Sequence, residues 1–365
     1  MALEVIGLKR FYGDFLISLD LKVEKGEILA LVGPSGSGKT STLNLIAGLA
    51  EPDIGRIIID GEDISRLPCW KRNISIVFQD LALFPHLDVG GNISYGLFIH
   101  GVKRKERQKI INEKLEKVRL PRYASRRIET LSGGVRQRVA IARALALSPR
   151  ALLLDEPFSS LDAPLRKEMR REFLEIHSNM EAPCVFVTHD REEAVMLGDR
   201  VALMDKGRII ETAPGRDLLL APDTAFAANF FGAGQVLQCK ILERQNSYTE
   251  VSSALGVLRV PHGSEYTPDL PQIFIPKDAI FFDGAGFSGQ KSFKARFSGA
   301  IYEGSNLVLK LLLDPLENRA EIQGTTGKAE ECIPFEVIAG PRMKLPSPFS
   351  MMTAYVDQSL IRFVR

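Results

Sequence analysis

The sequence has few of the features that mark secreted, metal-binding or membrane-spanning proteins. Its 365 residues include only 4 cysteines, without a C-x-x-C pair: Cys69, Cys184, Cys239 and Cys332. Isolated thiols are typical of a reducing compartment and indicate neither a disulfide framework nor a zinc site. No run approaches the roughly 18 apolar residues that a membrane-spanning helix needs. The N-terminus lacks the basic segment and apolar core of a signal peptide, so we expect a soluble, cytoplasmic chain.

An excess of charge of one sign is also missing. The 47 basic and 45 acidic residues leave a net charge of +2, which gives no reason to expect nucleic acid or an anionic membrane as a partner. The basic run Lys103–Arg107 is short and is interrupted by Glu106, so a solvated helix face is favoured over a nucleic-acid patch. The length predicts two domains.

A glycine-rich segment, Gly33–Thr40, follows the apolar run Ile28–Val32 and precedes a helix-like run that starts at Ser41. It has the pattern G-x-x-x-x-G-K-[ST] of a phosphate-binding loop, in which backbone N–H groups surround an anion at a helix N-terminus. Lys39 is expected to reach the β- and γ-phosphates, and the Thr40 hydroxyl to ligate Mg²⁺. A chance match in an ordinary turn is the alternative, but the strand and helix on either side favour nucleotide binding.

Polar side chains follow three further apolar runs: Gln79, Asp155 with Glu156, and His189. The carboxyl ends of parallel strands are where α/β proteins place their ligands. Asp155 fits a Mg²⁺ partner, and Glu156 fits a base that orients the attacking water. A single glutamine or histidine after a strand is often only a loop residue, so the carboxylates carry more weight.

Two other features are ambiguous from the residues alone. Ser132, Gly133 and Gly134 precede an apolar helical run, and this pattern fits either a second anion site or an ordinary capped helix. Tyr12 fits either a packed aromatic, which the residues favour, or a surface on which adenine stacks. Elsewhere, the pattern is helical from Asn92 to about Val118 and over residues 216–231, and it predicts a charged helix from about Pro164 to Asn179.

The composition changes at Gly232–Gly234, after which only short strand candidates with turn signals between them occur. This pattern predicts a small all-β barrel or sandwich. The candidates are Val236–Leu242, Gly256–Val260, Gln272–Ile275, Phe293–Tyr302, Leu307–Leu313, Ala320–Ile322, Cys332–Val337 and Met351–Val356.

Residues 1–231 resemble the ATP-binding cassette (ABC) ATPases, because six motifs occur in the family's order. They are Tyr12, Gly33–Thr40, Gln79, Leu131–Gly134, Leu154–Pro157 with Ser160–Asp162, and His189. The resemblance implies an α/β P-loop NTPase fold with a helical subdomain at about residues 88–148. It also implies that residues 232–365 form a regulatory or dimerisation domain, an OB- or TOBE-like barrel.

The resemblance further implies a role for each motif. Tyr12 is expected to stack on adenine, His189 to contact the γ-phosphate, and Gln79 to link Mg²⁺ or water to a transport partner. Two cassettes pair head to tail in this family, so Ser132 and Gly134 would cap the γ-phosphate held by a second copy of the chain. Asp162 would connect the two sites, and a homodimer is therefore expected.

The candidate site residues fall into three overlapping groups. The nucleotide-binding candidates are Tyr12, Gly33, Pro34, Ser35, Gly36, Ser37, Gly38, Lys39, Thr40, Ser41, Gln79, Ser132, Gly133, Gly134, Asp155 and Asp162. The catalytic candidates are Lys39, Gln79, Glu156 and His189. The Mg²⁺ candidates are Thr40, Gln79 and Asp155. ATP and Mg²⁺ are the expected cofactors.

A cassette followed by a β module resembles the ATPase subunits of bacterial importers in the maltose, polyamine, ferric-iron, sulfate and thiamine group. This implies integral-membrane permease subunits that dock at Gln79–Val89, a separate periplasmic or lipoprotein solute-binding protein, and a peripheral position on the inner face of the membrane. Nucleic acid is not an expected partner. The transported solute is not encoded in these residues.

Two other classes within the family are alternatives. A soluble ABC ATPase without a membrane partner usually carries two cassettes, and an exporter cassette normally lacks the β module. A P-loop kinase or GTPase would lack Leu131–Gly134. Three segments depart from the importer pattern: Val135, Gly90–Gly91 and Ile275–Asp278.

Overall fold

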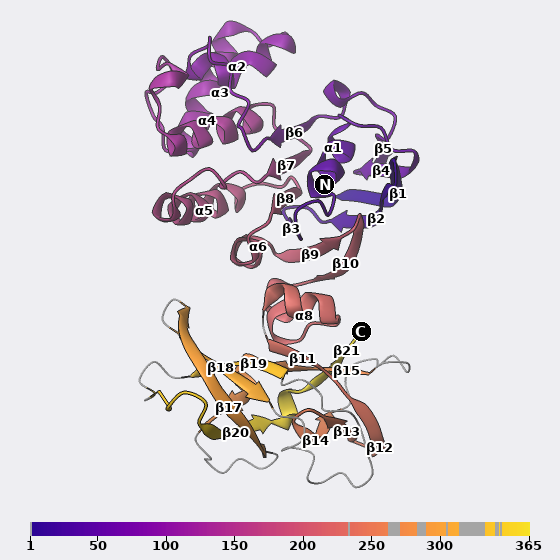
Figure 1. Ribbon diagram of the computed structural model, residues 1–365. Coiled ribbons are helices and arrows are strands. Elements are labelled where there is room, and N and C mark those ends of the chain that lie inside the picture. Colours follow the sequence, from indigo (N-terminus) through magenta and orange to yellow (C-terminus); the bar gives the residue numbers. More distant parts are fainter. Residues whose placement is uncertain are drawn as a thin grey trace. The chain divides into compact units, whose positions relative to one another are not determined.

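The computed structural model describes residues 2–232, 234–261, 271–282, 290–303, 306–313, 333–339, 343 and 345–365. These residues belong to two compact units, Met1–Gly215 and Arg216–Arg365, which are described separately (Figure 1). The sequence places the domain boundary at residues 231–232 instead, and that boundary stays a prediction. Among the described residues, no helix is long and apolar enough to cross a membrane.

The first unit is built on a six-stranded sheet with the order β10-β9-β3-β8-β7-β6. Its strands are β3 (Ile28–Val32), β6 (Ile74–Val77), β7 (Ala151–Asp155), β8 (Cys184–Thr188), β9 (Arg200–Asp205) and β10 (Arg208–Ala213). All neighbouring pairs are parallel except β9 with β10. Every residue of β3, β7 and β8 is buried, as continuous apolar runs predict for parallel strands covered on both faces.

An antiparallel sheet with the order β2-β1-β4-β5 accompanies the parallel one. Its strands are β1 (Leu3–Tyr12), β2 (Phe15–Val23), β4 (Ile54–Ile59) and β5 (Glu62–Asp63). One hydrophobic core contains residues of both sheets and of helix α1 (Lys39–Ala47). This core therefore fixes the loop between β3 and α1 against the rest of the unit.

Helices α2 (Val89–Ile99), α3 (Arg104–Lys117) and α4 (Gly133–Ala146) lie together (Figure 1), and α4 also contacts β6, where the Ser75 hydroxyl donates a hydrogen bond to the Ala144 carbonyl oxygen at 2.7 Å. The helical region expected over Asn92–Val118 is present as two helices, because Gly101 has φ +73° and the chain turns between α2 and α3. Helices α5 (Ala163–His177) and α6 (Arg191–Leu197) flank β8 in the chain. Short 3₁₀ helices occur at Cys69–Lys71 and Ile128–Thr130.

The second unit begins with helical turns and continues as strands. The helical region expected over residues 216–231 is present as two helices: α7 (Gly215–Leu220) and α8 (Ala225–Phe231) are separated by a segment that contains Pro222. Thr224 starts α8 by accepting a hydrogen bond from the Ala227 N–H at 3.1 Å. Beyond α8, the described residues form strands, with 3₁₀ turns at Lys277–Ala279 and Gln358–Leu360.

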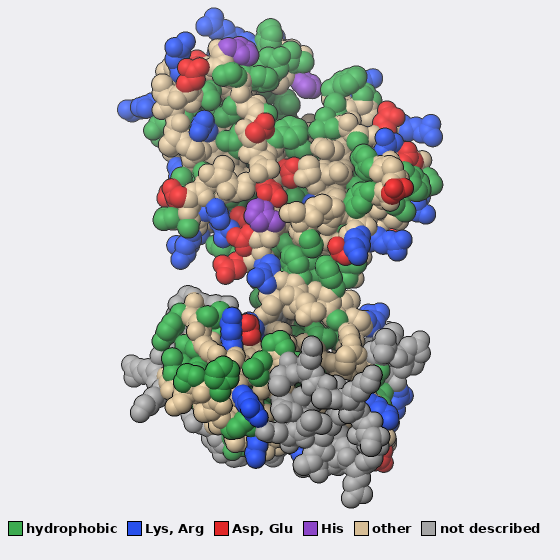
Figure 2. All heavy atoms as spheres, viewed as in Figure 1, with side chains coloured by type: hydrophobic (Ala, Val, Ile, Leu, Met, Phe, Trp, Pro, Cys, Tyr) green, Lys and Arg blue, Asp and Glu red, His purple; other side chains and the backbone are tan. Residues whose placement is uncertain are grey.

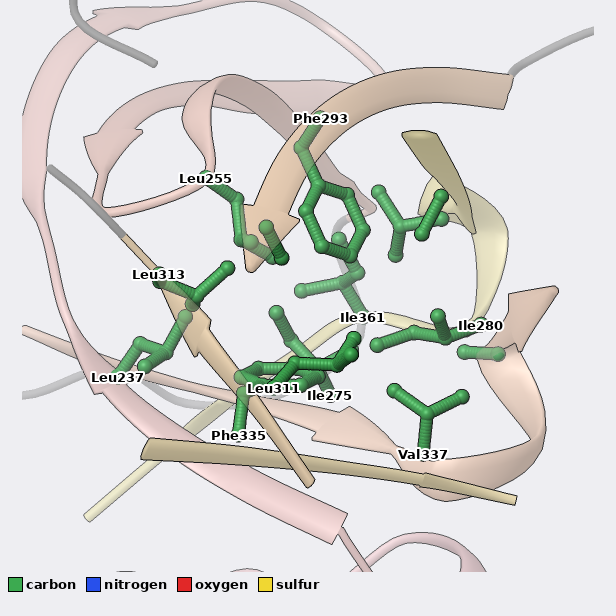
Figure 3. Close-up of a cluster of buried hydrophobic side chains, with 14 of the residues drawn as sticks. Leu237, Leu255, Ile275, Ile280, Phe293, Leu311, Leu313, Phe335, Val337 and Ile361 are labelled. Atoms are coloured by element: carbon green, nitrogen blue, oxygen red, sulfur yellow. The ribbon is translucent and has the colours of Figure 1, made fainter. Parts of the chain in front are cut away.

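These strands form three antiparallel sheets, with the orders β11-β15-β21, β12-β13-β14 and β16-β20-β17-β18-β19. The strands are β11 (Gly234–Gln238), β12 (Lys240–Arg244), β13 (Tyr248–Ser253), β14 (Gly256–Pro261), β15 (Gln272–Pro276), β16 (Ile280–Phe281), β17 (Gln290–Glu303), β18 (Asn306–Leu313), β19 (Ile333–Ala339), β20 (Met351–Asp357) and β21 (Arg362–Val364). All three sheets contribute to one apolar core, in which Leu237, Phe293 and Phe335 point toward one another (Figure 3). The expected all-β module is thus present.

Individual strand predictions in this module were less accurate. The expected strand Val236–Leu242 is two strands, β11 and β12, which belong to different sheets. Tyr248–Ser253 forms β13, although no strand was expected there. The candidate Ala320–Ile322 and residue Cys332 lie outside the described residues.

Candidate functional site

The loop between β3 and α1 wraps around the ammonium group of Lys39. The Lys39 Nζ donates hydrogen bonds to the carbonyl oxygens of Gly33 at 2.8 Å and Pro34 at 2.9 Å, and lies 3.5 Å from the Ser37 hydroxyl. Burial lowers the pKa of Lys39 below its ordinary 10.5, and the nearby carboxylates of Glu156 and Asp155 partly oppose this effect. An anionic ligand in the loop would offset the cost of burying this charge.

Two glycines are required by the path of this loop. A Cβ at Gly33 would lie 2.0 Å from the Met204 carbonyl oxygen of β9, so no other residue fits there. Gly38 has φ +104° and starts α1 from the left-handed region. The loop continues through Ser35 and Gly36, and α1 carries Lys39, Thr40 and Ser41 in its first turn. The backbone N–H groups at this helix start are available to an anion.

Thr40 and Asp155 bring a hydroxyl and a carboxylate together beside Lys39. The Thr40 hydroxyl donates a hydrogen bond to Asp155 Oδ1 at 3.1 Å, although 115 residues separate the two in sequence. Burial raises the pKa of Asp155 above its ordinary 3.8, an effect partly opposed by the hydrogen bond from Thr40. Two hard oxygen donors next to a phosphate-binding loop fit Mg²⁺, which prefers a few protein oxygens and substrate phosphates.

Glu156 and His189 form the second pair of the site. The Nδ1 atom of His189 lies 2.9 Å from Glu156 Oε2 and is hydrogen-bonded to it. Glu156 has φ +44°, a conformation that is uncommon for a non-glycine residue and that aims its side chain out of β7. Its N–H donates to the Val187 carbonyl oxygen at 3.0 Å, so β8 supports the strained turn.

The parallel register brings these residues to one edge of the sheet. Val32 pairs with Thr188, and Asp155 pairs with Val187, so Gly33, Glu156 and His189 all leave the sheet at its carboxyl edge. Gln79 follows β6, which is paired in parallel with β7, and is therefore at the same edge, exposed. It makes no hydrogen bond to another described residue.

Tyr12 ends β1 with 40% of its surface exposed, so the interpretation of this residue as a packed core aromatic is wrong. The Arg10 guanidinium lies over its ring, 5.4 Å from the centroid. Its cross-strand partner is Phe15, whose ring approaches to 3.3 Å of the position a Gly38 Cβ would take. The hairpin end that carries Tyr12 thus lies beside the phosphate-binding loop.

Ser132, Gly133 and Gly134 stand at the N-terminus of α4. Ser132 is the N-cap residue, but its side chain accepts no capping hydrogen bond, and it is exposed. Among the described residues, no hydrogen bond joins this segment to the phosphate-binding loop of the same chain. The single chain therefore brings together Lys39, Thr40, Asp155, Glu156 and His189, but leaves the α4 N-terminus outside this group.

Asp162 lies next to the α4 N-terminus. It caps α5 by accepting a hydrogen bond from the Leu165 N–H at 2.9 Å. Its neighbours Leu161 and Leu165 approach the α carbons of Gly133 and Gly134 closely enough that an added Cβ would contact them at 3.4 and 3.0 Å. The α4 N-terminus and the segment that contains Asp162 thus pack side by side, with Ser132 and Asp162 exposed and Gly134 buried.

The structure also reveals residues that the motifs did not indicate. Arg143 of α4 donates hydrogen bonds to the carbonyl oxygens of Leu81, at 2.7 Å, and Ala82, at 2.6 Å, just after Gln79. Asn92 of α2 accepts a hydrogen bond from the Phe84 N–H at 2.8 Å and donates one to the Asp88 carbonyl oxygen at 3.0 Å. The only sequence signal for Arg143 was a cation within an Ala- and Leu-rich helical run.

Arg72 is a further such residue. It is 1% exposed and donates to four carbonyl oxygens, including those of Leu45 and Ile46 in the last turn of α1, both at 2.9 Å. A cation at a helix C-terminus complements the helix dipole.

Over the visible face of the first unit, Lys and Arg side chains are interspersed with Asp and Glu side chains (Figure 2).

Comparisons with known proteins agree with this arrangement. Residues 16–159 match the family described as ABC transporter. The chain is 39% identical over 294 residues to the Fe(3+) ions import ATP-binding protein FbpC 1 of Haemophilus influenzae, a match that covers 80% of this chain and 87% of that protein. It is 42% identical over 283 residues to the Fe(3+) ions import ATP-binding protein FbpC of Brucella abortus, with 76% and 80% of the two chains covered. A Pasteurella multocida protein of the same name is 45% identical over 228 residues, 62% of this chain and 65% of that protein.

Proposed function

Because this chain belongs to the ABC transporter family, as an ATPase subunit of the bacterial importer type, we propose that it hydrolyses ATP to drive the uptake of ferric iron. The observation that carries the chemistry is the hydrogen-bonded pair of Glu156 and His189 beside Lys39, Thr40 and Asp155. Ferric iron is proposed because the relatives are named as Fe(3+) importers. The iron itself would be substrate of the whole transporter, bound by other subunits.

Each residue of the site has a distinct part in ATP hydrolysis. The N–H groups of the Gly33–Thr40 loop and the Lys39 ammonium bind the phosphates, and Tyr12 stacks on the adenine. Thr40 and Asp155, with Gln79, would hold Mg²⁺, which neutralises phosphate charge when bound. Glu156 accepts a hydrogen bond from the attacking water and orients it in line with the γ-phosphate. His189, held by Glu156, donates to a γ-phosphate oxygen as negative charge shifts in the transition state.

A second copy of the chain would complete the site. Ser132, Gly133 and Gly134 present a helix N-terminus with an uncapped serine on the surface, a feature suited to an anion on a partner. In a head-to-tail homodimer this segment would cap the γ-phosphate bound to the other subunit. Asp162, exposed beside this segment, would join the two sites. Binding of ATP would thus hold the dimer together, and hydrolysis would release it.

The permease is proposed to dock at Gln79–Val89. Arg143 and Asn92 hold the backbone of this segment, while Phe84 packs its ring against Tyr95 of α2 at a centroid distance of 4.7 Å. Tyr95 and Phe98 are 44% and 60% exposed, and they extend an apolar surface from the segment along α2. A short amphipathic helix from the cytoplasmic side of a permease fits such a surface. This docking would place the chain at the inner face of the membrane.

The remaining assignments are part of the same proposal. We assign residues 1–231 to the nucleotide-binding domain, with a helical subdomain at about 88–148. Residues 232–365 are assigned to a TOBE-like domain that supports dimerisation. A separate solute-binding protein would deliver the iron to the permease.

The first test measures Mg²⁺-dependent ATPase activity of the purified chain against its concentration. A composite site made by two copies predicts activity that rises faster than linearly with protein concentration. The Glu156→Gln variant should be inactive yet form a dimer in the presence of ATP, which size-exclusion chromatography with light scattering would detect. Activity that is linear in protein, together with a Glu156→Gln variant that stays monomeric in ATP, would contradict the head-to-tail site.

The second test addresses the solute. The chain is co-purified with its permease, reconstituted in liposomes, and assayed for ATP-dependent uptake of ferric iron delivered by the solute-binding protein. Iron uptake that requires Glu156 is the expected result. Transport of sulfate, thiamine or a polyamine in place of iron would keep the ATPase assignment and overturn the substrate.

A further inference from the structure

The His189 side chain has little to hold it apart from Glu156. It is 59% exposed, and its one hydrogen bond to another described residue is the one to Glu156. The position of the imidazole therefore depends on the backbone around it, that is, on Thr188 and Asp190. Both of these neighbours belong to a polar network that none of the motifs includes, in which Thr188 is buried and Asp190 is partly exposed.

The centre of this network is Arg170, from the middle of α5. Its Nε donates a hydrogen bond to Glu193 Oε1 at 2.9 Å, and its Nη2 donates to Asp190 Oδ2 at 2.8 Å. The other oxygen of Glu193 accepts a short hydrogen bond from the Thr188 hydroxyl. Arg170 is thus hydrogen-bonded directly to Asp190 and, through Glu193, to Thr188. Both residues that flank His189 are therefore connected to α5 by side-chain hydrogen bonds.

Burial makes this network rigid. Arg170, Glu193 and Thr188 are 9%, 4% and 1% exposed, whereas the side chain of Asp190 is 30% exposed. Burial by itself would lower the pKa of Arg170, but the carboxylates of Glu193 and Asp190 outweigh this effect and raise the pKa above its ordinary value. A buried charge that loses its hydrogen-bond partners destabilises the folded protein strongly. The side chains of such a network are therefore held in one arrangement.

Helix α5 is itself firmly placed. Phe173 packs its ring against Phe186 of β8, with centroids 6.5 Å apart, and against Phe158, with centroids 6.2 Å apart. The same helix begins at Asp162, the residue expected to meet the second subunit. Arg170 lies about two helical turns from Asp162, so α5 connects that surface to the His189 loop as one rigid element.

We propose that Arg170 is a positioning residue for hydrolysis, which holds His189 in line with the γ-phosphate by anchoring both of its neighbours to α5. This inference rests on the proposed role of His189. A purely structural role, in which Arg170 only supports the start of α6, is the competing explanation. The two differ in whether the effect of removing Arg170 depends on the presence of His189.

The test is a double-mutant cycle on single-turnover ATP hydrolysis by the full chain. Arg170→Met is made in the wild-type chain and in a His189→Ala chain, and Arg171→Met, a neighbouring exposed residue of α5, is the matched control. We expect Arg170→Met to lower the hydrolysis rate by roughly 10- to 100-fold, the cost of misplacing a reacting group by about 1 Å. The KM for ATP should change much less, because Lys39 and Tyr12 are untouched.

In the His189→Ala chain, Arg170→Met should reduce the rate less than twofold further, because the group it positions is already gone. The proposal would be overturned if Arg170→Met lowered the hydrolysis rate by the same factor in both chains, or if it raised only the KM for ATP and left the rate unchanged. If Arg170→Met does not fold, Arg170→Lys and Glu193→Gln enter the same cycle, since each keeps part of the network. A His189→Ala chain with full activity would instead contradict the role of His189, which separates failure of the proposed function from failure of this inference.

Discussion

The candidate site residues differ in how deeply they are buried. Lys39 and Asp155 are 6% and 7% exposed, and their charges are set by their surroundings before any ligand arrives. Gln79, Ser132 and Asp162 are exposed. Lys39 and Asp155 are proposed to bind phosphate and metal within one chain, whereas Ser132 and Asp162 are proposed to contact a second subunit. Exposure alone does not separate these roles, because Thr40, Tyr12 and His189 are also exposed and are proposed to bind Mg²⁺ or the nucleotide of their own chain.

Tyr12 is expected to contribute to ATP affinity through its ring alone. Stacking on a base is worth about 1–3 kcal/mol, so Tyr12→Ala should weaken ATP binding by roughly 5- to 150-fold, while Tyr12→Phe should bind nearly as the wild type. Calorimetric titration with ATP measures this. Phe11→Ala is the control, because Phe11 is also exposed but points to the other face of β1. Equal affinity of Tyr12→Ala and wild type would exclude adenine stacking on Tyr12.

Asp190 makes the stability of the protein depend on pH. Burial would raise its pKa, but hydrogen bonds from the Glu193 N–H and from Arg170 hold the pKa below the ordinary 3.8. A carboxyl group with a lowered pKa stabilises the folded state above its unfolded pKa, and this contribution is lost as pH falls through the lowered value. Asp190→Asn should therefore be less stable than the wild type near pH 7 by on the order of 1 kcal/mol.

The stability difference between these two proteins should begin to shrink below about pH 4, where Asp190 takes up a proton in the unfolded wild type. It should shrink further as the pH falls through the lowered pKa of Asp190 in the folded state. Urea unfolding at several pH values measures it. Asp14→Asn, in the exposed turn between β1 and β2, serves as the control and should show little change. A gap that stays constant down to pH 3 would contradict the assigned pKa direction.

At the scale of elements, α4 connects two parts of the cassette. Its N-terminus carries Ser132, and three turns later Arg143 holds the segment after Gln79. Leu81 and Ala82, which accept the hydrogen bonds of Arg143, have φ +63° and +43°. Left-handed residues of this kind are unfavourable unless other contacts hold them. Arg143 therefore stabilises the conformation of Gln79–Val89, the segment proposed to dock the permease and called the docking segment below.

Replacing Arg143 should loosen the docking segment. Hydrogen bonds from a charged donor contribute about 1.5–3 kcal/mol each, so Arg143→Met should speed amide hydrogen exchange across residues 79–87 and reduce the stimulation of ATPase activity by the permease. Lys109→Met, on the exposed face of α3, is the control. If amide hydrogen exchange across residues 79–87 were as slow in Arg143→Met as in the wild type, contacts other than those of Arg143 would hold this segment.

At the scale of the whole molecule, the two compact units have separate hydrophobic cores. One core draws its buried residues from between Leu3 and Met204, and the other from between Leu237 and Phe363. Neither core shares a residue with the other, and Arg216 begins the second compact unit. Each unit therefore has the apolar interior that an independently folding domain needs.

The chain should accordingly unfold in two transitions, and ATP should affect only one. In differential scanning calorimetry, MgATP at about 100 times its Kd stabilises the unit that binds it by about 2.7 kcal/mol, or roughly 5 °C for a unit of this size. The midpoint temperature of the β-rich unit's transition should not change with MgATP. Lys39→Met is the control and should show no shift with MgATP. A single transition that moves as a whole would contradict separate folding of the units.

The sequence by itself determined the elements whose signals are local. The runs Ile28–Val32, Ala151–Leu154 and Cys184–Thr188 are continuous and apolar, and each forms a buried parallel strand. The glycine pattern before Lys39 predicted the phosphate-binding loop, since only a tight turn between strand and helix needs those glycines. The resemblance to ABC ATPases rested on such motifs and is confirmed, whereas the roles of individual site residues stay predictions.

Only the tertiary structure decided which polar residues outside the motifs support the site. Arg72, Arg143 and Arg170 have no distinguishing neighbours in sequence, yet each folds onto partners from another element. Their choice of partner depends on packing between elements far apart in the chain, which a local pattern cannot encode. The breaks between α2 and α3 and between α7 and α8 were missed for a related reason, because helical periodicity continues across a turn that a single glycine or proline starts.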